Sequence, residues 1–229
     1  MLKITVLSGA GISAESGIQT FRDSDGLWEN HNVQDVATPE AFERDPALVL
    51  QFYNERRKNI AQVQPNDAHK QLVRLEEHYD VHIITQNIDD LHERAGSSKV
   101  MHLHGEIFKM CSKYNKAITY PIYNDIQLGD LASDGHQLRP FIVWFGEQVP
   151  MMDQAAEVCS ESVILLVVGT SLQVYPAAGL VHTVHRATPI YLIDKNPPTL
   201  SMPNLHIYAE NASSGIKKVV DLLLSSSLP

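Results

Sequence analysis

Short runs of apolar residues recur along the chain and predict β-strands. They cover residues 2–7, 81–85, 100–104, 141–145, 163–168 and 189–193. The run over 163–168 is apolar at every position, which is typical of a central parallel strand whose two faces are both covered. Polar or glycine residues follow these runs, so the strands are expected to end there.

Amphipathic stretches lie between the apolar runs and predict helices. Thr38-Pro39 and Asp45-Pro46 each place a capping residue before a proline, which is a common helix start. One side of the second helix, over residues 46–62, carries Val49, Phe52, Tyr53, Arg56 and Ile60. Further helices are expected over 68–78, 90–95, 153–160, 176–186 and 214–224. Residues 107–138 show no strong period and are interpreted as an irregular insertion with short strands around 116–123.

This alternation of strands and helices predicts an α/β fold. We expect a doubly wound, Rossmann-like parallel sheet with a second, smaller inserted domain. The larger domain would be discontinuous and would contain residues 1–25, 66–105 and 139–229. The smaller one would contain residues 26–65 and 106–138. A chain of 229 residues is long enough for this arrangement.

Candidate chemistry gathers where the predicted strands end, at Gly9, Gln86, His104, Gly146 and Gly169. In an open α/β sheet this edge carries the ligand. Gly9, Gly11 and Ala14 also fit G-x-G-x-x-A directly after the first strand, a pattern that lets a pyrophosphate approach the backbone. By itself the pattern fits equally a small-residue turn that only packs. Asp194 follows another strand and is placed to bind ribose hydroxyls.

Composition excludes some classes of function. The formal net charge of −9 argues against a general affinity for nucleic acid, and no apolar run approaches the length of a membrane span. The chain enters its first strand without a signal-like region, and it has only two cysteines, Cys111 and Cys159. Both features favour a cytoplasmic protein. The histidines lack the thiol or carboxylate neighbours of a metal site, so no metal is expected.

Five sequence blocks together resemble the sirtuins, the NAD-dependent protein-lysine deacylases. They are residues 9–18 with Phe21-Arg22-Asp23, residues 85–89, Leu103-His104-Gly105, residues 139–147 and residues 169–178. The blocks follow the order of the family and span nearly the whole chain. Tyr53-x-x-Arg56 is similar to the acyl-carboxylate motif of the bacterial deacetylase and desuccinylase branch.

The resemblance implies a reaction. Acetyl, succinyl or malonyl groups would leave protein lysines, with NAD consumed and nicotinamide and O-acyl-ADP-ribose formed. His104 would be the general base, a role that suits a side chain with an unperturbed pKa of about 6.5. A mono-ADP-ribosyltransferase using the same NAD site is the alternative enzyme, and an NAD-sensing module is the alternative without catalysis. A dehydrogenase gives no reason for Gln-Asn-Ile-Asp beside His-Gly. For Arg56 the alternative is an arginine that only extends to solvent.

The resemblance also implies site residues. His104 and Asn87 would be catalytic. Residues that would bind the cofactor are Gly9, Ala10, Gly11, Ile12, Ser13, Ser16, Gly17, Phe21, Arg22, Trp28, Gln86, Asn87, Ile88, Asp89, His104, Gly169, Thr170, Ser171, Asp194, Lys195, Asn196 and Ala212. Residues that would bind the acylated lysine peptide or protein are Tyr53, Arg56, Val143, Trp144, Phe145, Gly146, Glu147 and Val174. Residues 143–147 are similar to the peptide-binding strand of the family, at which the substrate backbone pairs with the edge of a sheet.

The chain departs from the family pattern in its metal site. Typical members carry four zinc cysteines in the insertion, whereas here Cys111 stands without a second cysteine before Arg139. Zinc is therefore expected to be absent. We expect packing of Tyr114, Tyr120, Ile122 and Tyr123 to replace it. Asp194 stands where members often have asparagine, which also bonds ribose oxygens.

Overall fold

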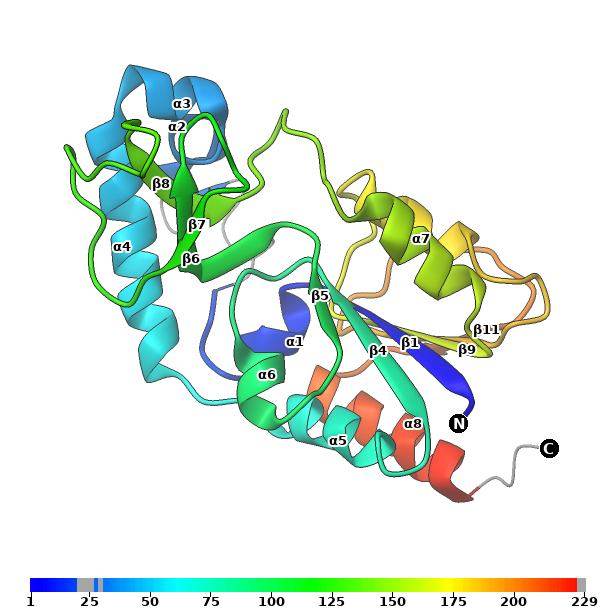
Figure 1. Cartoon of the computed structure of the whole chain (residues 1–229). Helices are drawn as coiled ribbons and strands as arrows, with labels where there is room; N and C mark the ends of the chain where they lie inside the picture. Colours follow the sequence, from blue (N-terminus) through cyan, green and yellow to red (C-terminus); the bar gives the residue numbers. More distant parts are fainter. Residues whose placement is uncertain (20–26, 29–30, 226–229) are drawn as a thin grey trace.

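A six-stranded parallel sheet forms the centre of the molecule in the computed structural model, which describes residues 1–19, 27–28 (backbone only) and 31–225 (Figure 1). Its strand order is β11-β10-β9-β1-β4-β5. The bounds are β1 Lys3–Ser8, β4 Asp80–Thr85, β5 Val100–His102, β9 Ile164–Val168, β10 Ile190–Ile193 and β11 Leu205–Tyr208. In chain order this is the 3-2-1-4-5-6 arrangement of dinucleotide-binding sheets. The predicted doubly wound, Rossmann-like sheet is confirmed.

The strand order reverses beside β1. After β1 the chain builds β4 and β5 on one side, and it then returns to build β9, β10 and β11 on the other. Consequently β1 pairs with both β4 and β9, with Ser8 opposite Thr85 and Val168. Ligands of open α/β sheets bind at such a switch point, outside the carboxyl ends of the strands.

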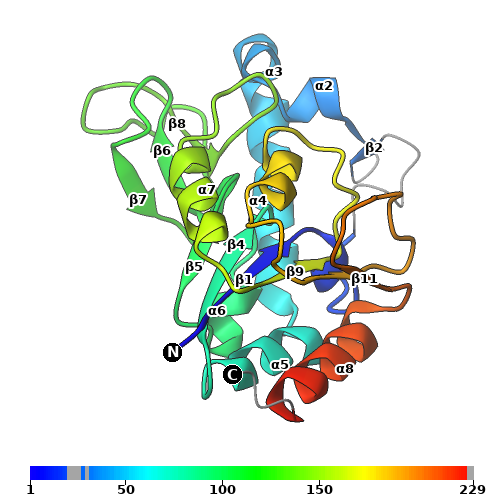
Figure 2. The same cartoon turned by 90° about the vertical axis from the view of Figure 1, so that its right-hand side faces the viewer.

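Helices cover both faces of this sheet, as Figure 2 shows. Helices α5 (Asp67–Leu75) and α8 (Ala212–Ser225) pack on one face, where Leu72, Val219 and Ile4 share a buried core. Helix α7 (Met152–Ser160) and the 3₁₀ helix η1 (Ala177–His182) pack on the other face. Every residue of β9 is buried, which agrees with its continuous apolar sequence.

A smaller group of elements stands beside the sheet and has its own buried core (Figure 1). A three-stranded antiparallel sheet, in the order β7-β6-β8, packs against helix α4 (Pro46–Gln62). Its strands are β6 Gly105–Ser112, β7 Thr119–Pro121 and β8 Leu138–Ile142. The remaining short elements are α1 Gly11–Ala14, β2 Leu27–Trp28, β3 His31–Asn32, α2 Val33–Val36, α3 Pro39–Arg44 and α6 Leu91–Ala95. The predicted division of the chain into two domains at the stated residues stays a prediction.

The predicted helix starts around α3 and α4 are confirmed. Thr38 Oγ1 accepts a hydrogen bond from the Ala41 N–H, and the Asp45 carboxylate accepts one from the Leu48 N–H. These caps satisfy amide groups that have no partner within the helix. The predicted stripe of α4 is also buried, Arg56 included.

Several predicted elements were wrong. Residues 105–112 form a strand, although only part of this segment is apolar, because β6 is half-buried between two partners. The strand expected over 141–145 begins earlier and ends at Ile142; Pro140 is tolerated there because β8 is an edge strand. The helix expected over 176–186 is a short 3₁₀ helix with Gly179 in its interior, a residue that weakens helices. β11 was missed because its edge position leaves it half-exposed.

The predicted packing of the insertion is only half right. Tyr120 and Ile122 pack against the small core, but Tyr114 and Tyr123 are 67% and 77% exposed. Side chains of α4 hold this region instead. Arg57 donates to the Ile107 and Asn124 carbonyls at 2.9 and 3.1 Å. Asn54 bonds both the N–H and the carbonyl of Ile126.

Candidate active site

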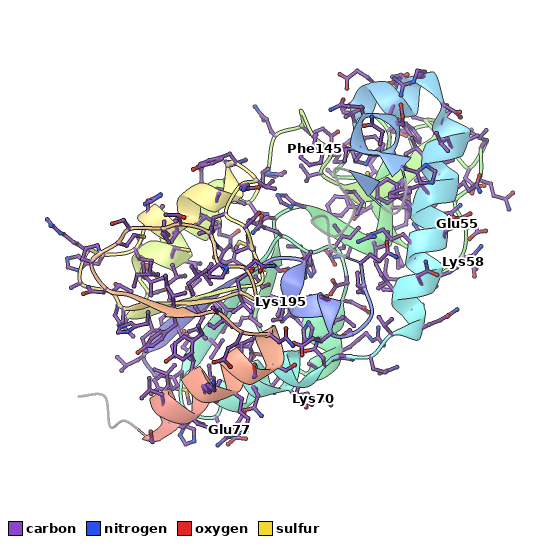
Figure 3. The ribbon with its side chains drawn as sticks, turned by 180° about the vertical axis from the view of Figure 1, so that it is seen from behind. Glu55, Lys58, Lys70, Glu77, Phe145 and Lys195 are labelled. Carbon is purple, nitrogen blue, oxygen red and sulfur yellow. The ribbon has the colours of Figure 1, made fainter. Side chains whose placement is uncertain are left out.

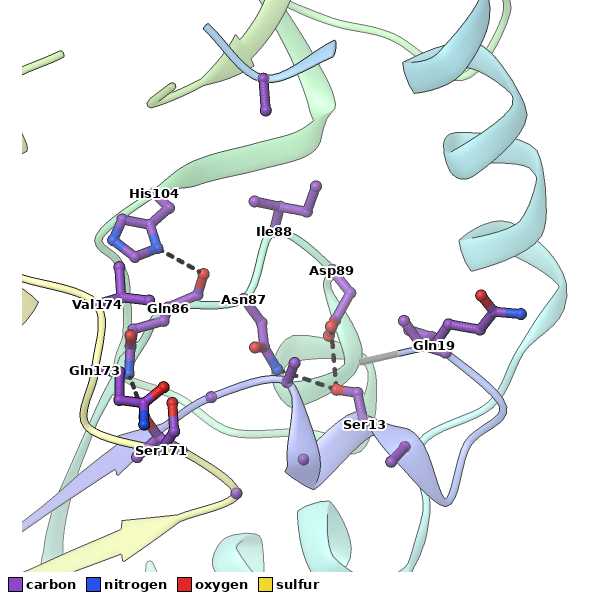
Figure 4. Close-up of a pocket in the computed structure, with 18 of the residues that line it drawn as sticks. Ser13, Gln19, Gln86, Asn87, Ile88, Asp89, His104, Ser171, Gln173 and Val174 are labelled. Atoms are coloured by element: carbon purple, nitrogen blue, oxygen red, sulfur yellow. Dashed lines mark hydrogen bonds between the residues drawn. The ribbon is translucent and has the colours of Figure 1, made fainter. Parts of the chain in front are cut away.

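A pocket of about 990 Å³ opens at the carboxyl edge of the six-stranded sheet, at the switch point beside β1 (Figure 4). Its volume lies at the upper end of the range of about 300–1,000 Å³ for ligand pockets. The residues that follow the predicted strands all line it: Gly9, Gln86, His104, Gly146 and Gly169. The predicted convergence is therefore confirmed for the four residues that follow strands of the large sheet, and Gly146 joins them from the segment after β8.

Most of the predicted site residues line this one pocket. From the cofactor set these are Gly9, Ala10, Gly11, Ser13, Gln86, Asn87, Ile88, Asp89, His104, Gly169, Thr170, Ser171, Asp194, Lys195, Asn196 and Ala212. From the substrate set these are Tyr53, Arg56, Val143, Trp144, Phe145, Gly146, Glu147 and Val174. Phe145 lies on the side of the small sheet and Lys195 on the side of the large one, as Figure 3 shows.

Three of the predicted residues that the structure describes do not line the pocket, and the side chains of three others fall outside the described part of the chain. Ile12 is fully buried in the core, Ser16 accepts a hydrogen bond from Asn66, and Gly17 has a φ of 96° in the turn after α1. These three support the loop from outside the pocket lining. Phe21, Arg22 and the side chain of Trp28 lie outside the described residues.

The glycines after β1 and β9 let two backbones cross in contact. A Cβ on Gly11 would lie 2.6 Å from Gly169 Cα, and a Cβ on Gly169 would lie 2.3 Å from Ile12 N. The Gly11 N–H donates to the Gly169 carbonyl at 2.8 Å. The N–H groups of Ile12 and Ser13 donate to Gly9 and Ala10. The glycines thus permit a close crossing of two backbone segments, and the expected approach of a pyrophosphate to this loop stays a prediction.

Ser13 joins two polar side chains of the loop after β4. The Ser13 hydroxyl donates to Asp89 Oδ2 and accepts from Asn87 Nδ2, both at 3.1 Å (Figure 4). Asp89 also accepts from the Leu91 N–H. Burial raises the pKa of Asp89, although these hydrogen bonds oppose the effect. The cluster fixes an amide and a carboxyl group at the inner wall of the pocket.

His104 follows β5, and one hydrogen bond fixes the tautomer of its ring. Its Nδ1 lies 3.0 Å from the Gln86 carbonyl oxygen, which only accepts, so Nδ1 carries the proton (Figure 4). In the neutral ring Nε2 is therefore the unprotonated nitrogen. Burial lowers the pKa of His104, which favours this neutral form.

His102 supports the same loop and was missed as a site residue. Its Nδ1 donates to the Asn87 carbonyl at 2.9 Å, and its Nε2 faces Glu93 Oε1 at 2.7 Å. Burial alone would lower the pKa of His102, but the hydrogen bond and charge of Glu93 and the bond to the Asn87 carbonyl together raise the pKa. The alternation of His102 and His104 along one strand was visible in the sequence. The sequence did not show that Glu93 on α6 lies opposite.

The other end of the pocket carries Tyr53 and Arg56, one turn apart on α4. Tyr53 is fully buried and Arg56 is 6% exposed. Trp144 Nε1 donates to the Tyr53 hydroxyl at 3.0 Å. Burial raises the pKa of Tyr53 and keeps the phenol neutral. This end therefore presents a guanidinium and a neutral hydroxyl, a pair suited to a carboxylate.

The segment after β8 is held by hydrogen bonds of its own. The Val143 N–H donates to the His104 carbonyl, and the Phe145 N–H donates to the Ala37 carbonyl. The segment is not a strand, because β8 ends at Ile142. A substrate backbone that pairs here has to use the other polar groups of residues 143–147.

The comparisons with known proteins agree with this architecture. A model described as the Sir2 family matches residues 9–176. The chain therefore belongs to the Sir2 family. It is 50% identical to a Bacteroides thetaiotaomicron protein named NAD-dependent protein deacylase, over 98% of this chain and 99% of that protein. A solved Sir2 homologue variant in complex with ADP-ribose has a TM-score of 0.88 at 34% identity, over 99% of this chain and 95% of that one. A Sir2 homologue–NAD complex has a TM-score of 0.86 at 35% identity, covering 97% and 89%.

The two cysteines are buried in different parts of the fold. Cys111 is buried in β6, and Cys159 is buried in α7 against the large sheet. Among the described residues, no group of three or more His, Cys, Asp or Glu side chains could hold a metal ion. Within the same residues, no helix has the length and apolar character needed to cross a membrane.

We expect the purified protein to contain no stoichiometric zinc, because one buried thiol in the small sheet cannot replace the four ligands that structural zinc requires. Elemental analysis after gel filtration measures this directly. The melting temperature with and without a chelator is the control, and it should not change. About one zinc per chain would contradict the expectation and would identify ligands other than cysteine.

Proposed function

We propose that this protein removes acyl groups from lysine side chains of proteins and consumes NAD in the reaction. One observation carries the proposal: His104, Asn87 and Asp89 line the same pocket as Tyr53 and Arg56. The pocket would therefore hold the reacting groups at one end and the acyl group of the substrate at the other. The names of the relatives and the NAD and ADP-ribose complexes of the solved homologues support the same activity.

The polar residues of the pocket fit NAD in two parts. Asp194, Lys195 and Asn196 follow β10 and would hold the adenosine half, for which an acidic side chain at a strand end is suited. Gln86, Asn87 and Asp89 would hold the nicotinamide half, with the Asp89 carboxyl accepting from the carboxamide. When bound, NAD supplies the ribose carbon that receives the acyl oxygen, with nicotinamide released and O-acyl-ADP-ribose formed.

His104 would act as the general base toward a ribose hydroxyl. The hydrogen bond from Nδ1 to the Gln86 carbonyl leaves Nε2 able to take a proton. Burial lowers the pKa of the ring and so favours its unprotonated form. Asn87, held by Ser13 and by His102, would orient the reacting end of the pocket.

The acid limb of activity tests this role. A base works only when it is unprotonated, so kcat/KM should fall as pH decreases through the pKa of His104. Because burial lowers that pKa, the midpoint should lie below about 6.5. The measurement uses an acetyl-lysine peptide, whose acyl group has no titrating carboxylate. If the residual activity of His104→Ala shows the same fall of kcat/KM at low pH, the titrating group is Asp89 instead of His104. A midpoint above about pH 7 would also contradict the proposal.

The preferred acyl group is the finer part of the proposal. We infer that Arg56 and Tyr53 receive the distal carboxylate of a succinyl or malonyl group, with Arg56 as charge partner and Tyr53 as hydroxyl donor. Acetyl-lysine would also react, because the chemistry at His104 does not need the carboxylate.

We also propose a cytoplasmic location, where the two buried thiols of the chain would stay reduced.

A comparison of peptides tests the function. The protein is incubated with NAD and with acetyl-, succinyl- or malonyl-lysine peptide, and nicotinamide release and peptide mass are followed. We expect equal amounts of nicotinamide and deacylated peptide from each. A mono-ADP-ribosyltransferase would instead release nicotinamide while the peptide or protein gained the mass of ADP-ribose. Nicotinamide release without any acyl peptide would contradict a deacylase.

A further inference from the structure

The hydroxyl of Tyr53 is oriented by an indole. An indole N–H can only donate, so in the 3.0 Å contact between Trp144 Nε1 and Tyr53 Oη the tyrosine oxygen is the acceptor. The Tyr53 hydroxyl keeps its own proton, and its O–H bond points away from the indole nitrogen. Both side chains are buried and both line the pocket, so this orientation is set inside the site.

Trp144 is itself fixed from its other side. The Arg139 guanidinium stacks over its ring, with Cζ 3.3 Å from the ring centroid. Arg139 donates to both oxygens of Glu147, at 2.9 and 3.2 Å, and to the Ile142 carbonyl at 2.7 Å. Glu147 also accepts from the Trp144 backbone N–H at 2.8 Å. The ring and the backbone of Trp144 are thus held by the same ion pair.

This ion pair connects the pocket to the small sheet. Lys116, in the turn between β6 and β7, forms a second salt bridge to Glu147 at 2.8 Å. Arg139 belongs to β8 and is 3% exposed. A continuous series of contacts therefore runs from the small sheet through Glu147, Arg139 and Trp144 to the hydroxyl of Tyr53.

We propose that Trp144 is a positioning residue for acyl selectivity: its N–H holds the Tyr53 hydroxyl as a donor toward an acyl carboxylate. The proposal rests on the function proposed above, in which Tyr53 and Arg56 receive that carboxylate. A hydroxyl that accepts one hydrogen bond donates the next more strongly, because consecutive hydrogen bonds polarise one another. Trp144 thus acts through Tyr53, without a contact to the carboxylate of its own.

A double-mutant cycle on selectivity tests this role. The readout is the ratio of kcat/KM for succinyl-lysine peptide to kcat/KM for acetyl-lysine peptide, in which losses common to both substrates cancel. Tyr53→Phe should lower the ratio by about tenfold or more, the effect of losing a hydrogen bond to a charged group. Trp144→Phe should lower it by about three- to tenfold, the effect of losing one neutral hydrogen bond. In the Tyr53→Phe background, Trp144→Phe should change the ratio less than about twofold, because no hydroxyl remains to be oriented.

The cycle separates the two levels of the argument. If Tyr53→Phe leaves the ratio unchanged, the carboxylate receptor of the proposed function is wrong. If Tyr53→Phe lowers the ratio but Trp144→Phe does not, the positioning role is wrong. It is also wrong if Trp144→Phe lowers the ratio by the same factor with and without the Tyr53 hydroxyl. In the second case Trp144 shapes the pocket without acting through Tyr53.

Trp144→His is the second variant and keeps an N–H donor on a smaller ring. It should retain more succinyl preference than Trp144→Phe if the N–H is what matters. Equal ratios for the two variants would overturn the proposal. Thermal melting of each variant shows that the compared proteins are folded. If Trp144→Phe fails to fold, Trp144→Leu, which also has no side-chain N–H, takes its place in the cycle.

Discussion

His104→Ala is expected to lower kcat/KM by about 10²–10⁴-fold for every acyl-lysine peptide, because the general base contributes a factor of this size. The loss should fall on the chemistry. The ring lines the pocket, and its Nδ1 donates a hydrogen bond to the Gln86 carbonyl. Its removal should therefore leave the melting temperature and the Kd for NAD close to those of the parent protein. Steady-state kinetics with acetyl- and succinyl-lysine peptides, together with calorimetric titration of NAD, measure both parts.

The chain offers a matched control for this variant. His78 is exposed after the end of α5 and does not line the pocket. His78→Ala removes the same side chain and should leave both rate and affinity unchanged. Full turnover in His104→Ala would remove His104 from the mechanism. An equal fall in NAD affinity would make its role one of binding.

The central sheet could be predicted because its strands are covered on both faces. A continuous apolar run such as residues 163–168 has one good explanation in a chain of alternating elements, and the structure places β9 over Ile164–Val168, fully buried. The same holds for the helix starts, since Thr38 and Asp45 are local capping signals that do not depend on the rest of the fold. The convergence of Gly9, Gln86, His104 and Gly169 followed from parallel topology, whereas Gly146 reaches the pocket from the antiparallel small sheet.

The small sheet could not be predicted, because its stability comes from contacts between segments distant in sequence. The side chains of Arg57 and Asn54 on α4 satisfy backbone groups of Ile107, Asn124 and Ile126. The motif singled out Arg56, but nothing in the sequence showed that its neighbour Arg57 is buried and bonds the carbonyls of the small sheet. Likewise, the tyrosines of the insertion could not be sorted into packed and exposed ones without knowing where β7 ends.

The candidate site shows the same limit at the level of single hydrogen bonds. Sequence blocks identified His104, Asn87, Tyr53 and Arg56, which line one pocket. They did not identify the groups that orient these residues, such as His102 beside Asn87. Such partners come from neighbouring elements, and their contacts depend on distances that no sequence spacing fixes.

Arg57 gives the matched control for a test of acyl selectivity, because it stands beside Arg56 on α4 but bonds the small sheet. Its guanidinium donates to two backbone carbonyls and to Asn54 Oδ1. Arg57→Lys should therefore lower the melting temperature, because a lysine cannot make all of these bonds. The ratio of desuccinylation to deacetylation should stay within about twofold of the parent value, since no bond to the substrate is lost.

Arg56→Met is expected to cut desuccinylation far more than deacetylation. The guanidinium would meet the distal carboxylate in a pocket that excludes much of the water, and losing a hydrogen bond to a charged group there costs about 1.5–3 kcal/mol. That energy corresponds to a fall of about tenfold to hundredfold in the ratio of kcat/KM for succinyl-lysine peptide to kcat/KM for acetyl-lysine peptide. Methionine keeps an unbranched apolar side chain, so the packing of α4 should change little. If kcat/KM falls equally for both peptides, Arg56 supports the helix and does not read the acyl group, and the succinyl and malonyl preference has to come from another part of the pocket.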